Sequence, residues 1–66
     1  MKKIVTVLGA GAWGTALSNL LADNGYDVVL WCYELNVVKE IESNRTNNSF
    51  FPNVNLSEKI MPTLDL

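Results

Sequence analysis

The sequence predicts an α/β fold in which a parallel three-stranded sheet carries both of its helices on one face. Three observations support this fold class. Two short apolar runs rich in β-branched residues, 4–8 and 28–32, have the composition of strands buried on both faces, which is typical of parallel sheets. Residues 9–27 between them, 19 in all, are enough for a helical crossover and too many for a hairpin. A helical apolar pattern fills that interval, and a second helix and a short third strand follow, which gives the order β-α-β-α-β.

The first helix is predicted over about residues 12–24. It follows a strand over about residues 3–8, and Asn24-Gly25 ends it because glycine accepts the left-handed backbone of a helix cap. Apolar residues recur at the spacing of one helix face, and we expect that face to pack on the sheet. The residues of this apolar stripe are Trp13, Ala16, Leu17, Leu20 and Leu21.

A second strand is predicted over about residues 27–32 and a second helix over 35–43. We expect Leu35, Val38 and Ile41 of that helix to face inward, with Val37 left open. The third strand, residues 59–63, contains Pro62, which cannot donate to a ladder and therefore indicates an edge strand. Right-handed crossovers with the strand order 3-2-1 then place both helices on the same face of the sheet.

A glycine-rich turn, Gly9-Ala10-Gly11-Ala12-Trp13-Gly14, lies between the first strand and the first helix. Its G-x-G-x-x-G spacing, in this strand–turn–helix context, is typical of a Rossmann-type dinucleotide-binding fold. Gly9 allows the tight turn, Gly11 lets a pyrophosphate approach the backbone, and Gly14 lets the helix pack against the strand. The free amides of Ala12 and Trp13 would face the phosphates at the positive end of the helix. We expect these six residues to bind a pyrophosphate; the alternative is a strand-to-helix turn without a ligand.

Tyr33 and Glu34 directly follow the second strand, at the same edge of the sheet as the turn. Glu34 lies 20 residues after Gly14, where a carboxylate can accept hydrogen bonds from an adenosine ribose. Like charge would disfavour a 2′-phosphate there, so NAD is the expected cofactor and NADP is less favoured. Alternatively, Glu34 is an acid favoured by the dipole of the second helix. Tyr33 could pack beside the adenine or be a plain surface aromatic.

Residues 44–58 are irregular and rich in asparagine, and they contain Phe50-Phe51-Pro52. Two adjacent aromatic residues in a polar loop could cap the open end of the core, or they could flank the adenine side of a cofactor. Trp13 also has two interpretations: its side chain could belong to the cofactor site, or core packing alone could explain it.

Composition argues against several functional classes. A net charge of −2, with no basic run beyond Lys2-Lys3, argues against nucleic acid or an anionic membrane as a partner. No apolar stretch approaches the roughly 20 residues of a membrane span. Histidine is absent and Cys32 is the only cysteine, so we expect no metal site and no intrachain disulfide. We interpret Cys32 as a small buried strand residue and the protein as cytoplasmic.

The length limits what the chain can do alone. A core built from 66 residues is thin, and cofactor-binding α/β domains are normally more than about twice as long. We therefore interpret residues 1–66 as the amino-terminal half of a dinucleotide-binding domain from a longer enzyme. One face of its sheet would be bare, and we expect the isolated piece to self-associate and to lack activity.

Several motifs resemble the amino-terminal end of NAD(P)-dependent glycerol-3-phosphate dehydrogenases. The most specific is the run from Gly11 to Leu17, Gly-Ala-Trp-Gly-Thr-Ala-Leu, because most dinucleotide-binding proteins have no Trp before the third glycine. The segments Leu21-Ala22-Asp23-Asn24-Gly25 and Val29-Leu30-Trp31 extend the resemblance. Asn47-Asn48-Ser49-Phe50-Phe51-Pro52, with Leu56, is similar to that family's Asn-x-x-Tyr-Leu-Pro segment.

The resemblance implies a parent enzyme that transfers hydride between NAD(P)H and dihydroxyacetone phosphate, giving sn-glycerol 3-phosphate for glycerophospholipid synthesis. It implies that residues 9–14 hold the pyrophosphate, that Tyr33 and Glu34 lie at the adenosine end, and that the catalytic residues lie in later segments. Phe50 and Phe51 depart from the usual Tyr and Leu, and Tyr33-Glu34 replaces a basic residue that many bacterial members carry. The rival functions are another Rossmann-fold dehydrogenase, acting on a sugar acid or keto acid, and a non-catalytic NAD(H)-sensing module.

Overall fold

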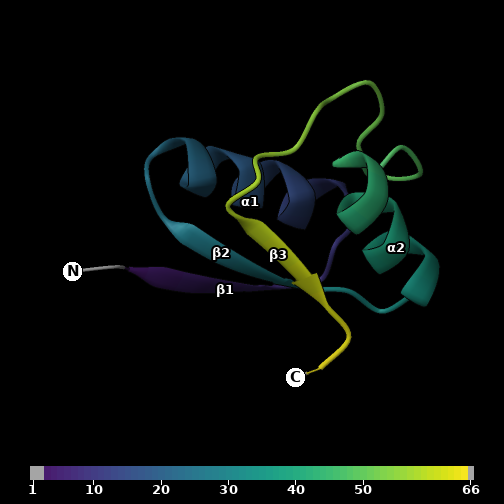
Figure 1. Ribbon diagram of the computed structural model, residues 1–66, viewed down its shortest axis with the longest axis horizontal. Coiled ribbons are helices and arrows are strands. Elements are labelled where there is room, and N and C mark those ends of the chain that lie inside the picture. The colour runs from purple at the N-terminus through teal and green to yellow at the C-terminus, as the bar shows by residue number, and fades with distance from the viewer. Residues whose placement is uncertain (1–2, 66) are drawn as a thin grey trace.

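The computed structural model describes residues 3–65 and has the predicted order of elements (Figure 1). Each boundary falls within one residue of its prediction. The elements are β1 (Ile4–Leu8), α1 (Ala12–Asp23), β2 (Asp27–Trp31), α2 (Leu35–Asn44) and β3 (Ile60–Thr63).

The three strands form one parallel sheet in the order β1-β2-β3, as the sequence predicts. Val5 pairs with Val28, and Val28 in turn pairs with Ile60, so equivalent faces of the strands are aligned. Pro62 lies on the edge strand, where its missing N–H leaves no gap in a central ladder. Figure 1 shows α1 and α2 on the same side of the sheet. Because β1 and β2 are parallel, their carboxyl ends meet at one edge of the sheet.

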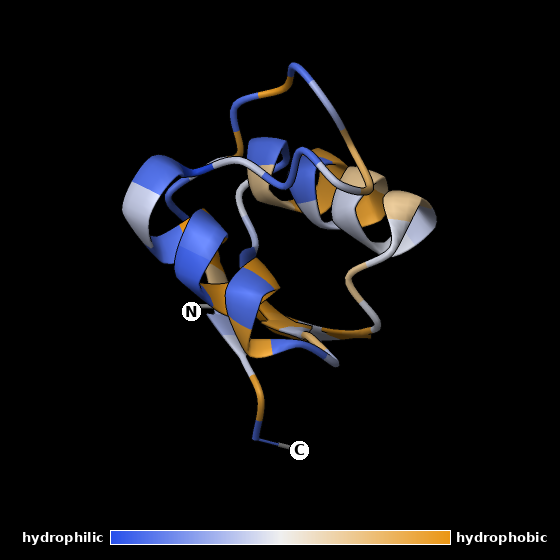
Figure 2. Cartoon of the chain, turned by 90° about the vertical axis from the view of Figure 1, so that its right-hand side faces the viewer, coloured by the Kyte–Doolittle hydropathy of each residue, from blue (hydrophilic) through white to orange (hydrophobic). Residues whose placement is uncertain are grey.

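The core fills the space between the sheet and the helices. Val28, Leu30 and Ile60 are fully buried on the strands, and Ile41 is fully buried on α2. Each such aliphatic side chain contributes about 1.5–3 kcal/mol when it leaves water. Figure 2 shows hydrophobic residues along the sheet and a hydrophilic outer side of α2.

β1 departs from the prediction of a strand buried on both faces. Val7 is the only residue of this strand that is fully in the core, whereas Ile4 and Leu8 are 63% and 64% exposed. Ile4 and Leu8 lie on the face of the sheet away from the helices, and no helix among residues 3–65 covers that face. The apolar composition of β1 is typical of a strand buried on both faces, but residues 3–65 bury only the face toward the helices.

The face of α1 that packs on the sheet differs from the predicted apolar stripe, of which Leu21 alone is among the residues packed against the core. The buried residues of this helix are Thr15, Ser18 and Ala22, while Trp13 is 87% exposed and Leu20 is 59% exposed. Small residues face the sheet because the helix starts in close contact with the turn that follows β1. The two buried hydroxyls remain satisfied: Ser18 Oγ donates to the Gly14 carbonyl at 2.7 Å, and Thr15 Oγ1 donates to the Ala10 carbonyl.

The second helix buries Val37, Val38 and Ile41, so the inward Val38 and Ile41 are confirmed and the open position Val37 is buried as well. The prediction for Leu35 is wrong, because this first residue of α2 lies beyond the edge of the core and is 52% exposed. The helix ends at Arg45, which adopts the left-handed conformation with φ 55°.

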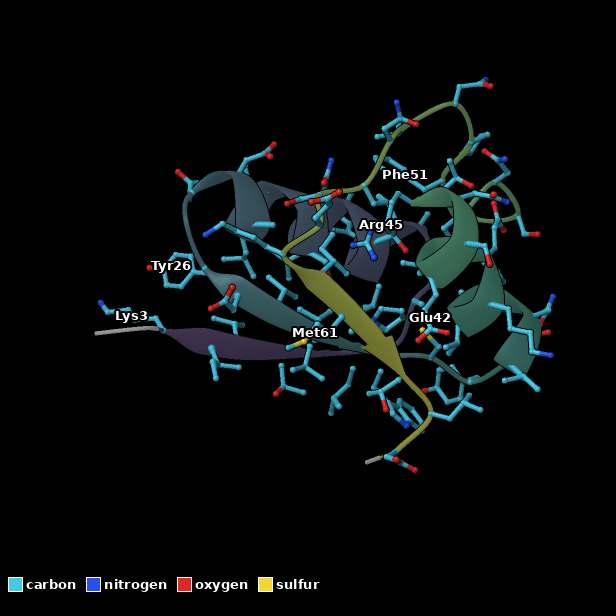
Figure 3. All side chains as sticks on the ribbon, in the orientation of Figure 1. Lys3, Tyr26, Glu42, Arg45, Phe51 and Met61 are labelled. Atoms are coloured by element: carbon cyan, nitrogen blue, oxygen red, sulfur yellow. The ribbon has the colours of Figure 1, made fainter. Side chains whose placement is uncertain are left out.

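Arg45 ties the end of α2 to the third strand. Its guanidinium lies between α2 and β3 (Figure 3) and donates to the carbonyls of Ser57 and Ile60. Its own carbonyl accepts the N–H of Leu56 at 2.7 Å. These bonds fix the irregular segment after α2, which the sequence described only as a loop.

Candidate functional site

The turn after β1 has the backbone shape that its glycines permit. Gly9 has φ +103°, a conformation that side-chain-bearing residues rarely adopt, and its N–H donates to the Trp31 carbonyl at 2.9 Å. Gly14 lies so close to the turn that an added Cβ would stand 1.8 Å from the Gly9 carbonyl oxygen. Both glycines are therefore required by the fold itself.

Gly11 is different, because beyond Gly11 and its two chain neighbours no protein atom lies within 4 Å of the place where its Cβ would be. Its φ of −73° is also open to any residue. The fold thus gives no reason for a glycine here, and the space beside Gly11 is open to a ligand.

The first turn of α1 presents unpaired backbone donors. The first intrahelical bond runs from the Thr15 N–H to the Gly11 carbonyl at 3.0 Å, and Gly11 as N-cap has no side chain to cap the helix. In the described part of the chain, the N–H groups of Ala12, Trp13 and Gly14 have no hydrogen-bond partner. No acidic residue occupies this turn. The end of the helix therefore carries uncompensated positive character that suits an anion.

A pocket of about 240 Å³ adjoins the turn at the carboxyl ends of β1 and β2. Four predicted site residues line it, two from the turn and two from the connection between β2 and α2. Val37 and Phe50 complete its wall. The predicted residues in the lining are Ala10, Gly11, Tyr33 and Glu34.

Two further predicted residues, Ala12 and Trp13, line a second hollow of about 290 Å³ together with Ala16 and Phe51. Trp13 is largely exposed there, so the interpretation of its side chain as core packing is wrong. The remaining two predicted residues, Gly9 and Gly14, line neither hollow and shape the turn from behind.

Tyr33 and Glu34 line the pocket beside the turn, and the Tyr33 ring lies 3.6 Å from where a Cβ on Gly9 would stand. Tyr33 is 75% exposed, and its ring meets that of Trp31 edge-on, with centroids 4.4 Å apart and an interplanar angle of 65°. Glu34 is exposed at the N-cap position of α2, and its carboxylate makes no capping hydrogen bond. The acid therefore stands at the pocket free to accept hydrogen bonds from another molecule.

The loop after α2 contributes residues that the sequence left undecided. Phe51 packs against the core, as one of the two predictions for this pair holds, and Phe50 lines the pocket together with Glu34. Asn47 is a residue to which the sequence pattern gives no site role, although it is fully buried and hydrogen-bonded to the turn. The resemblance of its segment to an Asn-x-x-Tyr-Leu-Pro motif was the available signal.

Other reactive groups play no part in this geometry. Cys32 is buried directly after β2, and its Sγ lies 3.5 Å from the Leu30 carbonyl. Burial raises the pKa of the Cys32 thiol, and a backbone hydrogen bond with Thr63 offsets part of that rise. Residues 3–65 contain no group of His, Cys, Asp and Glu side chains that could hold a metal ion. No helix in this range is both long and apolar enough to cross a membrane.

The order of elements, the glycine turn and the pocket at the strand ends match one half of a Rossmann-type fold. The profile of the family described as NAD-dependent glycerol-3-phosphate dehydrogenase N-terminus matches residues 4–66. The chain belongs to this family.

Relatives and solved structures agree with that assignment. A glycerol-3-phosphate dehydrogenase [NAD(P)+] of Carboxydothermus hydrogenoformans is 52% identical over 62 residues, which is 94% of this chain and 18% of the relative. One from Citrifermentans bemidjiense is 46% identical over all 66 residues and 20% of its own length. The crystal structure of the Coxiella burnetii glycerol-3-phosphate dehydrogenase matches 98% of this chain and 20% of that one, at 42% identity and a TM-score of 0.89. The chain thus spans about a fifth of the length of these proteins.

Proposed function

We propose that this chain binds the ADP-ribose and pyrophosphate part of a nicotinamide dinucleotide. The observation that carries the proposal is the open space beside Gly11 next to the unpaired N–H groups that begin α1. Backbone donors at the positive end of a helix suit a pyrophosphate, and a side chain at position 11 would occupy its place. These amides and the pocket together fit the cofactor that the family name contains.

In this proposal, the residues of the site divide between the two ends of the ligand. Residues 9–14 hold the pyrophosphate through backbone donors. Glu34 accepts hydrogen bonds from the adenosine ribose, while Tyr33 and Phe50, which line the same pocket, offer apolar surface to the adenine. The carboxylate favours NAD, and NADP, with its 2′-phosphate, is the less favoured cofactor.

We further propose that residues 1–66 are the first half of a dinucleotide-binding domain in a longer, cytoplasmic enzyme. That enzyme interconverts dihydroxyacetone phosphate and sn-glycerol 3-phosphate, a precursor of glycerophospholipids. The bound dinucleotide supplies or accepts the hydride in this reaction. The role of this chain is to bind and orient that cofactor, and we assign no catalytic residue to it. Family membership favours this activity over a dehydrogenase of other substrates or a non-catalytic NAD(H) sensor.

A test compares the wild type with two glycine variants in the full-length protein that carries this chain. Wild type should bind NADH and oxidise it with dihydroxyacetone phosphate. Gly11→Val should melt near the wild-type temperature, because its Cβ meets no protein atom, yet lose at least about a hundredfold in NADH affinity as the pyrophosphate is displaced. Gly14→Val should lower the melting temperature strongly, because its Cβ collides with the Gly9 carbonyl.

Titration calorimetry and thermal melting separate these outcomes. Undiminished NADH binding by a folded Gly11→Val variant would refute the proposed pyrophosphate site. NADH binding without turnover of dihydroxyacetone phosphate would favour the rival functions.

A further inference from the structure

The carbonyl of Ala10 is held by two buried side chains. Asn47 Nδ2 donates to it at 2.9 Å from 37 residues further along the chain, and Thr15 Oγ1 donates to it at 3.2 Å. Asn47 Nδ2 also donates to Thr15 Oγ1 at 2.9 Å. Thr15 and Asn47 have no exposed surface, and Ala10 is 5% exposed. The three groups form a closed cluster behind the glycine turn.

This cluster fixes the orientation of the peptide bond between Ala10 and Gly11. The bond is trans, so its carbonyl and its N–H point in opposite directions. Because the Ala10 carbonyl is held toward Thr15 and Asn47, the Gly11 N–H must point away from them. That N–H has no partner within the described chain, and Gly11 itself lines the pocket. The cluster therefore keeps one more backbone donor turned outward at the head of α1.

Asn47 holds the Ala10–Gly11 peptide through the N–H groups of its side-chain amide, and the shape of the side chain alone would not do so. The atom facing the Ala10 carbonyl must be Nδ2, because a carbonyl oxygen can only accept. The other amide atom, Oδ1, is buried without a partner in the described residues. An apolar side chain of similar size would avoid that penalty and would lose only the two donated bonds. Those bonds are what the asparagine adds at this position.

Asn47 also positions Phe50, another lining residue of the pocket, but through its backbone. Its carbonyl accepts the N–H groups of Phe50 at 3.2 Å and Phe51 at 2.7 Å. Phe50 lines the pocket that Gly11 lines. A side-chain substitution at Asn47 leaves this carbonyl in place, so the two contributions of the residue can be tested separately.

We propose that Asn47 is a positioning residue for the pyrophosphate site. Its side chain, acting with Thr15, holds the Ala10–Gly11 peptide so that the turn meets the pyrophosphate with its donors already aligned. This inference rests on the proposed dinucleotide-binding function. The structure assigns the role to a residue far from the glycine turn in sequence.

The experiment measures ligand affinities and melting temperatures in the full-length protein that carries this chain. Asn47→Ala should weaken binding of NADH and of ADP-ribose at least about tenfold, the effect expected when one bond to a charged group is lost. Competition by adenosine, which lacks the pyrophosphate, should change less than about twofold, since the Phe50 wall depends on the Asn47 backbone. Thr15→Val, which keeps the side-chain volume, should weaken NADH binding as well, and the double variant should lose less than the sum of the two.

Leu56→Ala is the matched control. It removes a buried side chain from the same loop and leaves the bonds to Ala10 intact. It should lower the melting temperature while keeping the NADH affinity within about twofold of the wild type. Equal losses of affinity in Asn47→Ala and Leu56→Ala, or equal weakening of adenosine and ADP-ribose, would reduce Asn47 to a structural role and overturn the inference. Should Asn47→Ala fail to fold, Thr15→Val carries the same comparison.

The wild type distinguishes this inference from the proposed function. A wild type that does not bind NADH would refute the proposed function. A wild type that binds NADH no better than Asn47→Ala would refute the positioning role alone.

Discussion

Glu34 determines the charge at one wall of the pocket. It is exposed, and among residues 3–65 its carboxylate has no hydrogen-bond or ion-pair partner. An unpaired carboxylate can accept hydrogen bonds from ribose hydroxyls, but it repels a phosphate in the same place. Because the group is exposed, solvent and salt screen that repulsion and reduce its effect.

At the residue scale, we therefore predict that the full-length protein prefers NADH to NADPH and that Glu34→Arg reverses the preference. The wild-type preference and its reversal in Glu34→Arg should each amount to about tenfold or more in the ratio of the kcat/KM values for the two cofactors. Both effects should shrink as salt is added. Steady-state kinetics with both cofactors at two ionic strengths provide the measurement. Glu58→Arg is the control, because it makes the same charge change at an exposed position near the opposite end of the sheet. A wild type that prefers NADPH would show that Glu34 does not face the ribose.

At the element scale, the position of α2 depends on how the helix ends. Arg45 is both the left-handed residue that stops the helix and the side chain that reaches Ser57 and Ile60 near the start of β3. A left-handed conformation costs a residue with a Cβ about 1 kcal/mol relative to glycine. Bonds from a charged donor contribute about 1.5–3 kcal/mol each, so the side chain outweighs the backbone cost.

This balance predicts an order of stability among variants at position 45. Arg45→Gly should lower the melting temperature, because it removes the guanidinium bonds while relieving the backbone. Arg45→Ala should lower it further, by the equivalent of about 1 kcal/mol, because the methyl group retains the left-handed cost. Thermal melts followed by circular dichroism measure the order. An Arg45→Gly variant more stable than the wild type would mean that the guanidinium bonds contribute less than the strained backbone costs.

At the scale of the whole molecule, apolar surface remains uncovered on two sides. The sheet face opposite the helices exposes Ile4, Leu8 and Met61, and the outer side of α1 exposes Trp13 and Leu20. Parallel strands are normally covered on both faces, and apolar patches of this kind are sites of association. Another part of a longer chain or a second copy of this one can supply the cover.

We predict that the isolated 66-residue chain self-associates and does not turn over dihydroxyacetone phosphate with NADH. Sedimentation velocity should give a mass above the 7.3 kDa monomer that rises with concentration. The double variant Leu8→Lys, Met61→Lys should shift the chain toward the monomer, because it places charge on the bare sheet face. The double variant Asn36→Lys, Ser43→Lys, which adds the same charge at exposed positions of α2, should not. A monomeric wild-type chain with a sharp melting transition would contradict the prediction.

The amino-acid sequence alone predicts the order of the elements, the parallel sheet, the edge position of β3 and the place of the glycine turn. These features follow from local signals: runs of β-branched residues, the spacing between them, and glycine and proline at fixed positions. Four of the eight predicted site residues also line one pocket, because parallel strands bring the ends of β1 and β2 to one edge.

Which surfaces are buried and which loop residue reaches the turn depend on the folded arrangement and could not be predicted from the sequence. The periodicity of α1 shows an apolar stripe, but the close approach at Gly14 selects the face with Thr15 and Ser18 instead. Asn47 carries no local signal for burial, since its partners at Ala10 and Thr15 come near only when the chain has folded back over them. Periodicity and turn residues act between neighbours in the chain, whereas burial depends on what the completed fold places on each surface.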